Sequence, residues 1–436
     1  MVNKSSRREF LRKAAATTAG AFILPQIVPA SALGLNGKTP PSDRIVMAGI
    51  GVGSQGKSNM RSFLNKKEIQ FVAVCDVDKN NGLSAKDLVD KQYANSDCRQ
   101  YSDFREILEK EKLDAVCLAL PDHWHAIISV NCANKKLDIY GEKPLARSIR
   151  ESQAIVNAVK KNNIIWQTGS WQRSVENFRI GAELVMNGRI GKVNYVEVGL
   201  PDGKRSIGTP PVMPVPEGLD WEFWLGPALK VPYRGVCHWN WRWIQDYSGG
   251  QLTDWAGHHI DIAHWGLGFD RTGPVSVEGT GIYPREGIYD VAVEYDFLCT
   301  YANGVKMRVA NASRLKHGMG TVWHGENGWI QVNRGNVLEA SDPSILKNIV
   351  KPGEKLLYKS TDHQQNFIDC IRSRKETITP AEIAHRSISV GLLGEIAMLT
   401  NTKIQWDPEK EEIIDNHYAS RLLNRPYREP WTLPVI

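Results

Sequence analysis

Short apolar runs alternate with polar helical stretches between residues 45 and 165. The runs at 45–50, 69–75 and 115–120 contain almost no polar residue, which is typical of parallel strands covered on both faces. Helical periodicity appears near 57–65, 102–110 and 126–135. This alternation of strand and helix predicts a doubly wound α/β Rossmann domain over residues 43–165.

The pattern changes after residue 165. A helix is predicted near 175–187, and alternating apolar and polar positions predict strands at 193–199, 275–283, 291–301, 305–312 and 328–333. Helical periodicity returns where Phe367, Cys370 and Ile371 share one face, and 383–399 is predicted to be a long apolar helix. Residues 166–436 are therefore predicted to form an α+β domain with a large, mostly antiparallel sheet. Residues 406–436 have no clear period, and we consider a contact between subunits as one role for them.

An apolar run also follows basic residues at the N-terminus. The stretch Ser6-Arg7-Arg8-Glu9-Phe10-Leu11-Arg12 has a twin-arginine pattern, the apolar run 14–24 follows it, and Ala30-Ser31-Ala32 offers a peptidase cleavage site. Residues 1–32 are therefore predicted to be a twin-arginine signal peptide and 33–42 a linker, with an uncleaved N-terminal helix as the alternative. We expect an exported, periplasmic protein.

Composition narrows the class of protein. The 436 residues are enough for two cores, and 42% hydrophobic with 23% charged residues is ordinary for a globular chain. The net charge of +6 falls to about +2 without the predicted leader, so no basic stripe argues for nucleic acid. The seven cysteines form no CxxC pair, and no later run is long and apolar enough for stable membrane insertion.

A glycine-rich turn carries the first chemical signal. Gly51, Gly53 and Gly56, with Ser54 and Gln55 between them, match GxGxxG at the junction of a predicted strand and helix. The glycines permit a tight turn and close approach of a pyrophosphate to the helix N-terminus. Asp76 follows the second predicted strand, where a carboxylate accepts hydrogen bonds from ribose hydroxyls and repels a 2'-phosphate, so NAD is favoured over NADP. The alternative is a surface aspartate at a strand end.

Two further motifs follow predicted strands, where ligands of α/β sheets bind. They are the loop Pro121–His125 and the tripeptide Glu142-Lys143-Pro144. Pro144 biases Lys143 towards an extended backbone. In the second domain, Asp254 and His258 are four residues apart and would share one face of an α-helix.

Together with Gln172-Arg173 and the stretch 249–254, these motifs resemble the glucose-fructose oxidoreductase, inositol dehydrogenase and MocA (Gfo/Idh/MocA) family across the mature chain. The resemblance implies that Lys143 contacts both nicotinamide and substrate hydroxyl, that Asp254 and His258 complete the catalytic set, and that the C-terminal helices pack back on the first domain. His258 is the favoured base, because a histidine titrating near neutrality suits proton transfer. Contacts to the cofactor are expected from Gly51, Gly53, Ser54, Gln55, Gly56, Asp76, Pro121, His125, Glu142, Lys143, Gln172 and Arg173.

Tryptophans are concentrated at 221–243, and flat aromatic faces can stack on sugar rings. Packing of the domain is the alternative role for them. Substrate contacts are expected from Trp171, Arg173, Trp241, Arg242, Asp254, His258 and His259. A metal site built from these histidines with Asp254, Asp261 and His264 is not favoured, because adjacent side chains on a helix point about 100° apart.

These interpretations predict an NAD-dependent enzyme that oxidises a hydroxyl of a sugar, glycoside or polyol, for example to a 3-keto sugar. The alternatives are a redox-neutral, NAD-dependent glycosidase that works by oxidation and elimination, and a cofactor-bearing sugar-binding protein without catalysis. We expect a small carbohydrate or polyol as partner, no nucleic acid, no metal, and a homo-oligomer, either a dimer or a tetramer.

Overall fold

A computed structural model describes residues 43–235, 240–347 and 353–436. The predicted signal peptide at 1–32 and linker at 33–42 lie outside the described residues, as do His238 and Trp239. Residues 45–436 hold together as one unit, in which two sheets share a continuous apolar core.

The first sheet has six parallel strands in the order β3-β2-β1-β4-β5-β6, which is the order of a dinucleotide-binding fold. The predicted Rossmann class is confirmed. Its sixth strand, Trp166–Thr168, lies beyond the predicted domain boundary at residue 165, because pairing with β5 buries it completely. The strands are β1 (Ile45–Ile50), β2 (Ile69–Cys75), β3 (Arg99–Tyr101), β4 (Ala115–Leu118), β5 (Asp138–Gly141) and β6 (Trp166–Thr168).

Five helices flank this sheet, and two of them begin earlier than the sequence pattern predicts. The first begins at Ser54 rather than near Lys57, and another begins at Asp122, so the predicted loop Pro121–His125 is mostly a first helical turn. Residues 122–130 are buried on every side, so no amphipathic period marks the start of this helix. The helices are α2 (Ser54–Leu64), α3 (Lys79–Tyr93), α4 (Phe104–Lys110), α5 (Asp122–Asn134) and α6 (Ile149–Asn162).

The second sheet has nine strands in the order β13-β12-β11-β7-β10-β9-β8-β14-β15. Only β7 and β10 pair in parallel, so the predicted mostly antiparallel sheet is confirmed. The sequence pattern missed β13, β14 and β15, which are too short to show a clear alternation, and β11, whose first four residues are all buried. The strands are β7 (Val193–Leu200), β8 (Ser276–Ile282), β9 (Glu294–Thr300), β10 (Lys306–Asn311), β11 (Gly320–Gly325), β12 (Gly328–Asn333), β13 (Val337–Ala340), β14 (Ile404–Asp407) and β15 (Glu412–Ile414).

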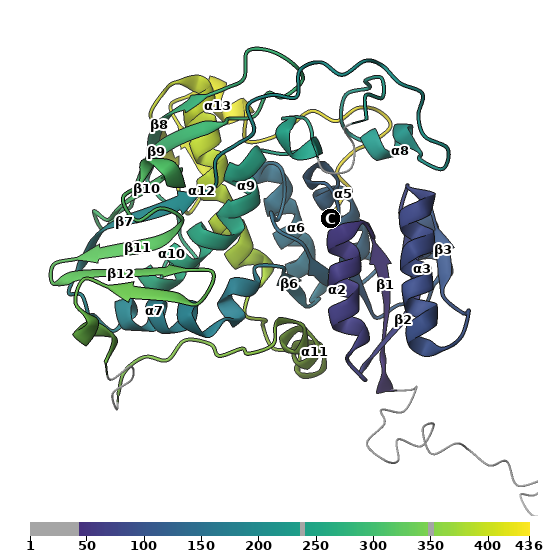
Figure 1. The fold of residues 1–436 in the computed structure, drawn as a ribbon, viewed down its shortest axis with the longest axis horizontal. Coiled ribbons are helices and arrows are strands. Elements are labelled where there is room, and N and C mark those ends of the chain that lie inside the picture. Colours follow the sequence, from purple (N-terminus) through teal and green to yellow (C-terminus); the bar gives the residue numbers. More distant parts are fainter. Residues whose placement is uncertain (1–42, 236–239, 348–352) are drawn as a thin grey trace, which may run out of the picture. The chain divides into compact units, whose positions relative to one another are not determined.

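Helices α9 (Gly250–Trp255), α10 (Asp261–Leu267) and α12 (Ala381–Thr400) lie between the two sheets (Figure 1). Nearly every residue of α12 is buried, as expected for a helix inside a protein core. Phe367 of α11 packs against Phe63 and Tyr140 of the first domain. The remaining helices are α7 (Glu176–Met186), α8 (Trp221–Leu225), α11 (His363–Ser373) and α13 (His417–Arg421).

The C-terminal stretch without a sequence period packs on its own chain. Trp431 stacks on Phe223 with ring centroids 5.4 Å apart and meets Trp124 edge-on at 4.7 Å. Arg428 donates hydrogen bonds to the carbonyl groups of Gly226 and Ala228. The last residues therefore hold α8 against the start of α5.

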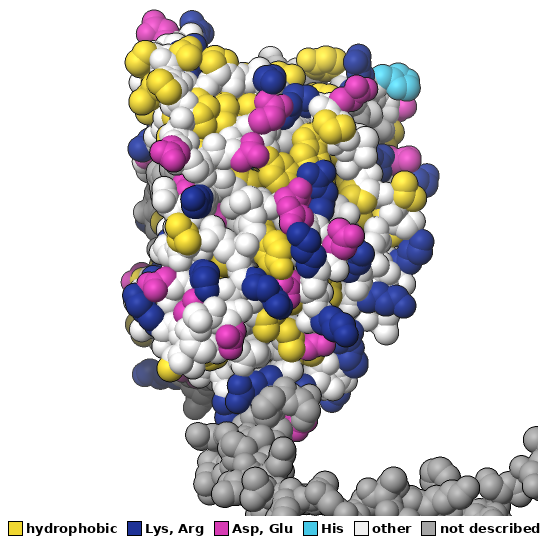
Figure 2. Space-filling model, turned by 90° about the vertical axis from the view of Figure 1, so that its right-hand side faces the viewer, with side chains coloured by type: hydrophobic (Ala, Val, Ile, Leu, Met, Phe, Trp, Pro, Cys, Tyr) yellow, Lys and Arg dark blue, Asp and Glu magenta, His cyan; other side chains and the backbone are white. Residues whose placement is uncertain are grey.

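The face beside α3 and β3 carries intermingled basic and acidic side chains (Figure 2). Within the described ranges, no helix combines the length and the apolar character that crossing a bilayer requires. Six of the cysteines lie in these ranges, and all six are buried and unpaired.

Candidate active site

The glycine-rich turn between β1 and α2 has the backbone of an anion-binding site. Gly51 has φ +75°, and a Cβ there would lie 2.5 Å from the carbonyl oxygen of Ala119. A Cβ on Gly56 would lie 2.1 Å from the carbonyl oxygen of Gly51, so α2 can pack this closely only with glycine. Gly53 caps α2 without a side-chain hydrogen bond, and the first turn has no acidic residue. The positive end of α2 therefore fits the pyrophosphate of a dinucleotide.

Asp76 follows β2 directly. Its Oδ2 accepts a hydrogen bond of 2.9 Å from the Val52 backbone N–H, and its Oδ1 accepts one of 2.9 Å from Asp78. The carboxylate thus fixes the glycine-rich turn. Since each carboxylate oxygen has two lone-pair sites, Asp76 retains acceptor capacity for ribose hydroxyls.

One cleft joins this turn to the second domain. Its empty volume is about 1160 Å³, including space open to solvent. It contains eight of the predicted cofactor residues and three of the predicted substrate residues, so side chains far apart in the sequence meet there. These are Gly51, Gly53, Ser54, Gln55, Asp76, Pro121, Glu142, Lys143, Trp241, Arg242 and Asp254.

Glu142 positions the residues around it. Its Oε1 accepts hydrogen bonds from Gln55 at 3.1 Å and from Asn59 at 2.9 Å. Its Oε2 accepts a bond of 3.3 Å from the backbone N–H of Lys143. Glu142 therefore ties α2 to the end of β5 and fixes the backbone that carries Lys143.

Lys143 and Asp254 form an ion pair that bridges the two domains. Lys143 Nζ lies 2.7 Å from Asp254 Oδ1, and both side chains are 15% exposed. Arg242 Nε lies 3.6 Å from the same oxygen. Burial opposes ionisation of Asp254, but the charges of Lys143 and Arg242 outweigh it and lower the pKa of the carboxyl. Asp254 is therefore a carboxylate at neutral pH.

A π-helical segment, η5 (Ala256–Ile260), separates α9 from α10 and carries His258. This differs from the predicted continuous α-helix, so the expected α-helical spacing of Asp254 and His258 does not hold. Gly257 brings η5 against the lysine stem, since a Cβ at this position would lie 3.1 Å from the Cβ of Lys143. Ser170 Oγ holds the segment with a hydrogen bond of 2.7 Å to the Gly257 carbonyl.

His258 is buried and uncharged beside this ion pair. Burial, and then the positive charges of Lys143 and Arg334, lower its pKa well below the ordinary value. Its Nδ1 has no hydrogen-bond partner among the described residues. The ring lies between Trp255 at 5.4 Å and Trp171 at 6.3 Å, centroid to centroid. His258 does not itself line the cleft.

Arg334 is a site residue that the sequence analysis missed. Its guanidinium carbon lies 4.2 Å from the ring centroid of Trp255 and 4.7 Å from that of Trp171. Its Nε donates a hydrogen bond of 3.2 Å to Gln172 Oε1. The turn signal Asn333-Arg334-Gly335-Asn336 between two alternating runs could have indicated a hairpin tip here.

Several predicted contact residues have supporting positions instead. Gln172 and His259 do not line the cleft, and they contact each other at 3.3 Å behind Arg334. Both ring nitrogens of His125 lie at hydrogen-bond distance from backbone carbonyls, those of Pro144 at 2.6 Å and Leu120 at 2.9 Å. These side chains hold the site's loops together, and the chain alone could not reveal these long-range partners.

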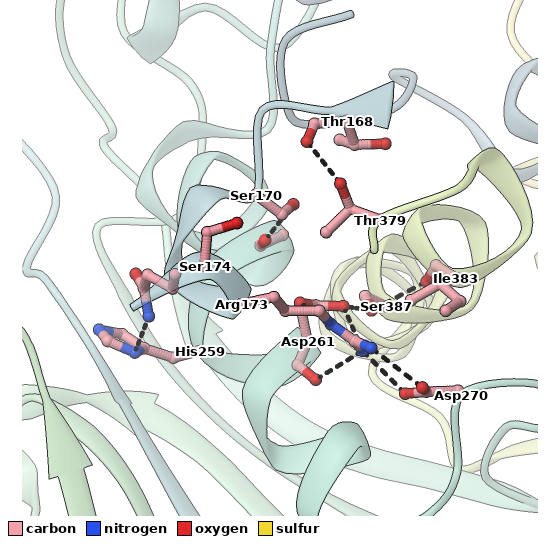
Figure 3. Close-up of polar contacts among 12 residues, drawn as sticks. Thr168, Ser170, Arg173, Ser174, His259, Asp261, Asp270, Thr379, Ile383 and Ser387 are labelled. Carbon is pink, nitrogen blue, oxygen red and sulfur yellow. Dashed lines mark hydrogen bonds and ion pairs between the residues drawn. The ribbon is translucent and has the colours of Figure 1, made fainter. Parts of the chain in front are cut away.

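Arg173 was expected at both the cofactor and the substrate, and the structure places it elsewhere. It is 1% exposed, and its Nε lies 2.7 Å from Asp261 while its terminal nitrogen Nη2 lies 2.7 Å from Asp270 (Figure 3). Ser387 Oγ donates a further hydrogen bond of 2.9 Å to Asp261. Arg173 therefore anchors the end of η5 rather than lining the cleft.

The tryptophan-rich segment mostly packs the protein. Trp221 and Trp224 stack with centroids 4.8 Å apart, while Trp243 is buried against Tyr289. Trp241 does line the cleft, with the Arg242 guanidinium 4.4 Å from its ring centroid. The residues considered for a metal do not converge, since Asp261 binds Arg173 and His264 contacts Tyr301.

Buried histidines predict acid lability. Burial is the main cause that lowers the pKa of His123 and His259 to about 3, and that of His264 and His363 to about 4. Below about pH 6.5 the unfolded chain binds protons that the folded chain excludes, so the free energy of unfolding falls with pH down to about 4. Each ring contributes up to about 1.4 kcal/mol per pH unit. Urea unfolding at several pH values measures this, and a constant free energy of unfolding between pH 7 and 5 would contradict it.

Both halves of the chain are similar to known protein families. Residues 44–170 match the family model described as "Oxidoreductase family, NAD-binding Rossmann fold", and residues 203–433 match "Oxidoreductase family, C-terminal alpha/beta domain", both of the Gfo/Idh/MocA group. Myo-inositol 2-dehydrogenase of Thermotoga maritima is 23% identical over 273 residues, covering 62% of this chain and 69% of its own.

Two further similarities extend this comparison. An α-N-acetylgalactosaminidase of Shewanella oneidensis is 26% identical over 214 residues, covering 44% of this chain and 43% of its own. The crystal structure of the WlbA dehydrogenase from Bordetella pertussis, in complex with NADH and UDP-GlcNAcA, superposes with a TM-score of 0.62 at 16% identity. That match covers 84% of this chain and 99% of the other. The chain belongs to the Gfo/Idh/MocA family of oxidoreductases.

Proposed function

We propose that this protein uses NAD to oxidise a hydroxyl group of a sugar, glycoside or polyol. The observation that carries the proposal is the Lys143–Asp254 ion pair, which lies in the same cleft as the glycine-rich turn and beside uncharged His258. A cation and a neutral base next to a dinucleotide cleft are the groups that alcohol oxidation requires.

Three residues of the chain have separate roles in oxidising the hydroxyl group. A bound nicotinamide supplies the hydride acceptor. Lys143 donates a hydrogen bond to the reacting hydroxyl oxygen and offsets the negative charge that develops there. His258 accepts the hydroxyl proton, because its lowered pKa keeps the ring unprotonated at neutral pH. Asp254 holds the Lys143 ammonium group in place at 2.7 Å.

We propose NAD rather than NADP as the cofactor. Next to the end of β2 the cleft is lined by Asp76, Asp78 and Asn81, while the cations among its described lining residues, Lys143 and Arg242, contact Asp254 instead. The carboxylates of Asp76 and Asp78 would repel a 2'-phosphate. This charge distribution supports NAD as the proposed cofactor.

Relatives support the substrate class. A curated relative is named as an inositol dehydrogenase and another as a levoglucosan dehydrogenase, and both names denote hydroxyl-rich cyclic substrates. Half-exposed Trp171 beside His258 offers an aromatic face for such a ring.

A mass-spectrometric screen tests the proposal. The mature protein is incubated with a pool of sugars, glycosides and inositols and either NAD or NADP. We expect one pool member to lose two hydrogens with NAD and to react much more slowly with NADP. An untouched pool, with NAD bound, would overturn the catalytic proposal in favour of a sugar-binding role.

Redox-neutral cleavage of a glycoside is the second candidate. The observation that favours it is the similarity to the α-N-acetylgalactosaminidase. The same screen separates the two reactions, because cleavage gives a free sugar and an aglycone with no net change in NAD. We rank oxidation first, since the Glu142-Lys143-Pro144 motif is intact.

We also propose that the protein reaches its site of action by the twin-arginine route. The support is the sequence pattern at residues 6–32. A protein exported after folding can carry its dinucleotide from the cytoplasm. N-terminal sequencing of the protein from the periplasmic fraction should find Leu33 or a neighbouring residue first, and an intact Met1 would contradict cleavage.

A further inference from the structure

Arg334 lies at the tip of the β12–β13 hairpin, and the surrounding structure fixes its position. Asn177 Nδ2 donates hydrogen bonds of 2.8 Å to the carbonyl groups of Asn333 and Val337, so α7 clamps both ends of the turn. Asn333 Oδ1 accepts a hydrogen bond of 2.7 Å from the Arg334 backbone N–H. Gly335 and Asn336 adopt the left-handed conformation that reverses the chain. The hairpin therefore presents Arg334 to the catalytic residues rather than to bulk solvent.

Arg334 is partly buried, and it differs from the more deeply buried arginines of this protein. Arg147, Arg173 and Arg179 each contact a carboxylate at about 2.7 Å. Within the part of the chain that the structure describes, Arg334 takes part in no ion pair. Its polar contact there is the amide oxygen of Gln172, and the two tryptophan rings cover its faces. Burial lowers the pKa of its guanidinium, and the negative charge of Asp254 opposes this shift without cancelling it.

Arg334 and His258 both contact the indole ring of Trp255. The guanidinium carbon of Arg334 lies 4.2 Å from the Trp255 ring centroid, and the His258 ring meets the same indole edge-on at 5.4 Å between centroids. Trp171, which is 39% exposed, contacts both groups as well. A sugar ring lying on Trp171, with its reacting hydroxyl towards Lys143 and His258, would therefore direct another substituent towards Arg334.

Resting on the proposed function, we propose that Arg334 binds a carboxylate of the substrate, so that the preferred substrate is a sugar acid of the hexuronic type. The planar guanidinium matches a carboxylate with two parallel hydrogen bonds. The Nε of Arg334 is held by Gln172, which leaves the terminal nitrogens for the ligand. With a neutral sugar bound, the charge of Asp254, which forms no direct ion pair with Arg334, would be the attraction that offsets burial of this cation.

Calorimetry on the protein saturated with NADH tests the proposal without turnover, because the reduced cofactor cannot accept a hydride. The probes are the methyl glycosides of glucose and galactose, each paired with the corresponding methyl glucuronide or galacturonide. Charge-assisted hydrogen bonds predict that at least one uronide binds roughly 10- to 100-fold more tightly than its neutral partner. Arg334→Gln should abolish that preference, with a much larger loss of affinity for the uronide than for the neutral glycoside, while Arg334→Lys should retain part of the preference.

Arg314→Gln is the matched control, since Arg314 is 42% exposed and pairs with Asp296 on the sheet. It should keep the preference, and both Gln variants should unfold at the parent temperature. Equal binding of acidic and neutral glycosides, or no binding of either uronide, would overturn the proposal, as would an equal loss for both classes in Arg334→Gln. Tighter binding of glucose 6-phosphate than of glucuronide would overturn the assignment to a carboxylate. Uronide binding without oxidation would count against the proposed function alone.

Discussion

Lys143→Met should reduce kcat by roughly 10²- to 10³-fold, the range for losing a donor that stabilises negative charge developing on an oxygen. Methionine keeps the length of the side chain but lacks the ammonium group that lies 2.7 Å from Asp254. The glycine-rich turn is unchanged, so the affinity for NAD should stay close to that of the parent. Single-turnover reduction of NAD measures the chemical step, and titration with NADH measures binding.

A structural side effect of this change can be separated from catalysis. In this variant only Arg242 would still oppose the effect of burial on the ionisation of Asp254. The pKa of that carboxyl should therefore rise. The double variant Lys143→Met/Asp254→Asn removes the unpaired charge, so it should recover stability without recovering kcat. Lys91→Met is the control, since Lys91 is 76% exposed and pairs with Asp87 on the surface. A Lys143→Met protein that turns over at the parent rate would disprove the catalytic role.

Arg173→Met should lower the free energy of unfolding by about 3–5 kcal/mol, the range for removing one partner of a buried ion pair. Two carboxylates, Asp261 and Asp270, would lose the cation that they share. Burial already raises the pKa of Asp261 in the presence of Arg173, so the unpaired carboxylate would be still harder to keep ionised. Because Asp261 directly follows η5, kcat should fall with stability. Urea unfolding followed by circular dichroism measures the change.

Arg271, which follows Asp270 in the chain, provides the matched control for Arg173. Arg271 pairs with Glu376, and both side chains are 56% exposed. Its replacement by methionine should cost less than about 1 kcal/mol, because solvent screens exposed pairs. If Arg173→Met and Arg271→Met had the same small effect, the buried network would not be stabilising the chain around η5.

The residues of the dinucleotide-binding half of the site could be predicted from short stretches of the sequence. Gly51, Gly53 and Gly56 act through backbone conformation and close packing, which depend on a strand–turn–helix sequence within a few residues. Asp76 and Lys143 could be placed because they lie one and two residues beyond the ends of β2 and β5, and all strands of a parallel sheet end on the same side. The apolar runs that predicted these strands are buried on both faces.

The roles of residues in the second domain were harder to predict, because their interactions join residues far apart in the chain. Arg173 pairs with carboxylates 88 and 97 positions away, so a motif that indicated ligand contact belongs to the core. Trp221 and Trp224 resembled a sugar platform, but they pack on each other, although Trp224 also lines the cleft. Composition cannot distinguish an aromatic ring that binds a ligand from one that fills a core.

The sequence by itself determined the Rossmann fold, the dinucleotide turn, the antiparallel second sheet and the presence of Lys143, Asp254 and His258. Only the tertiary structure decided how these residues meet. The π-helical segment depends on packing of Gly257 against Lys143 and on anchoring by Ser170 and Arg173. The hairpin that places Arg334 beside His258 depends on Asn177 of a distant helix. Local patterns specify elements because their causes lie within a few residues, whereas contacts between distant side chains exist only after the chain has folded.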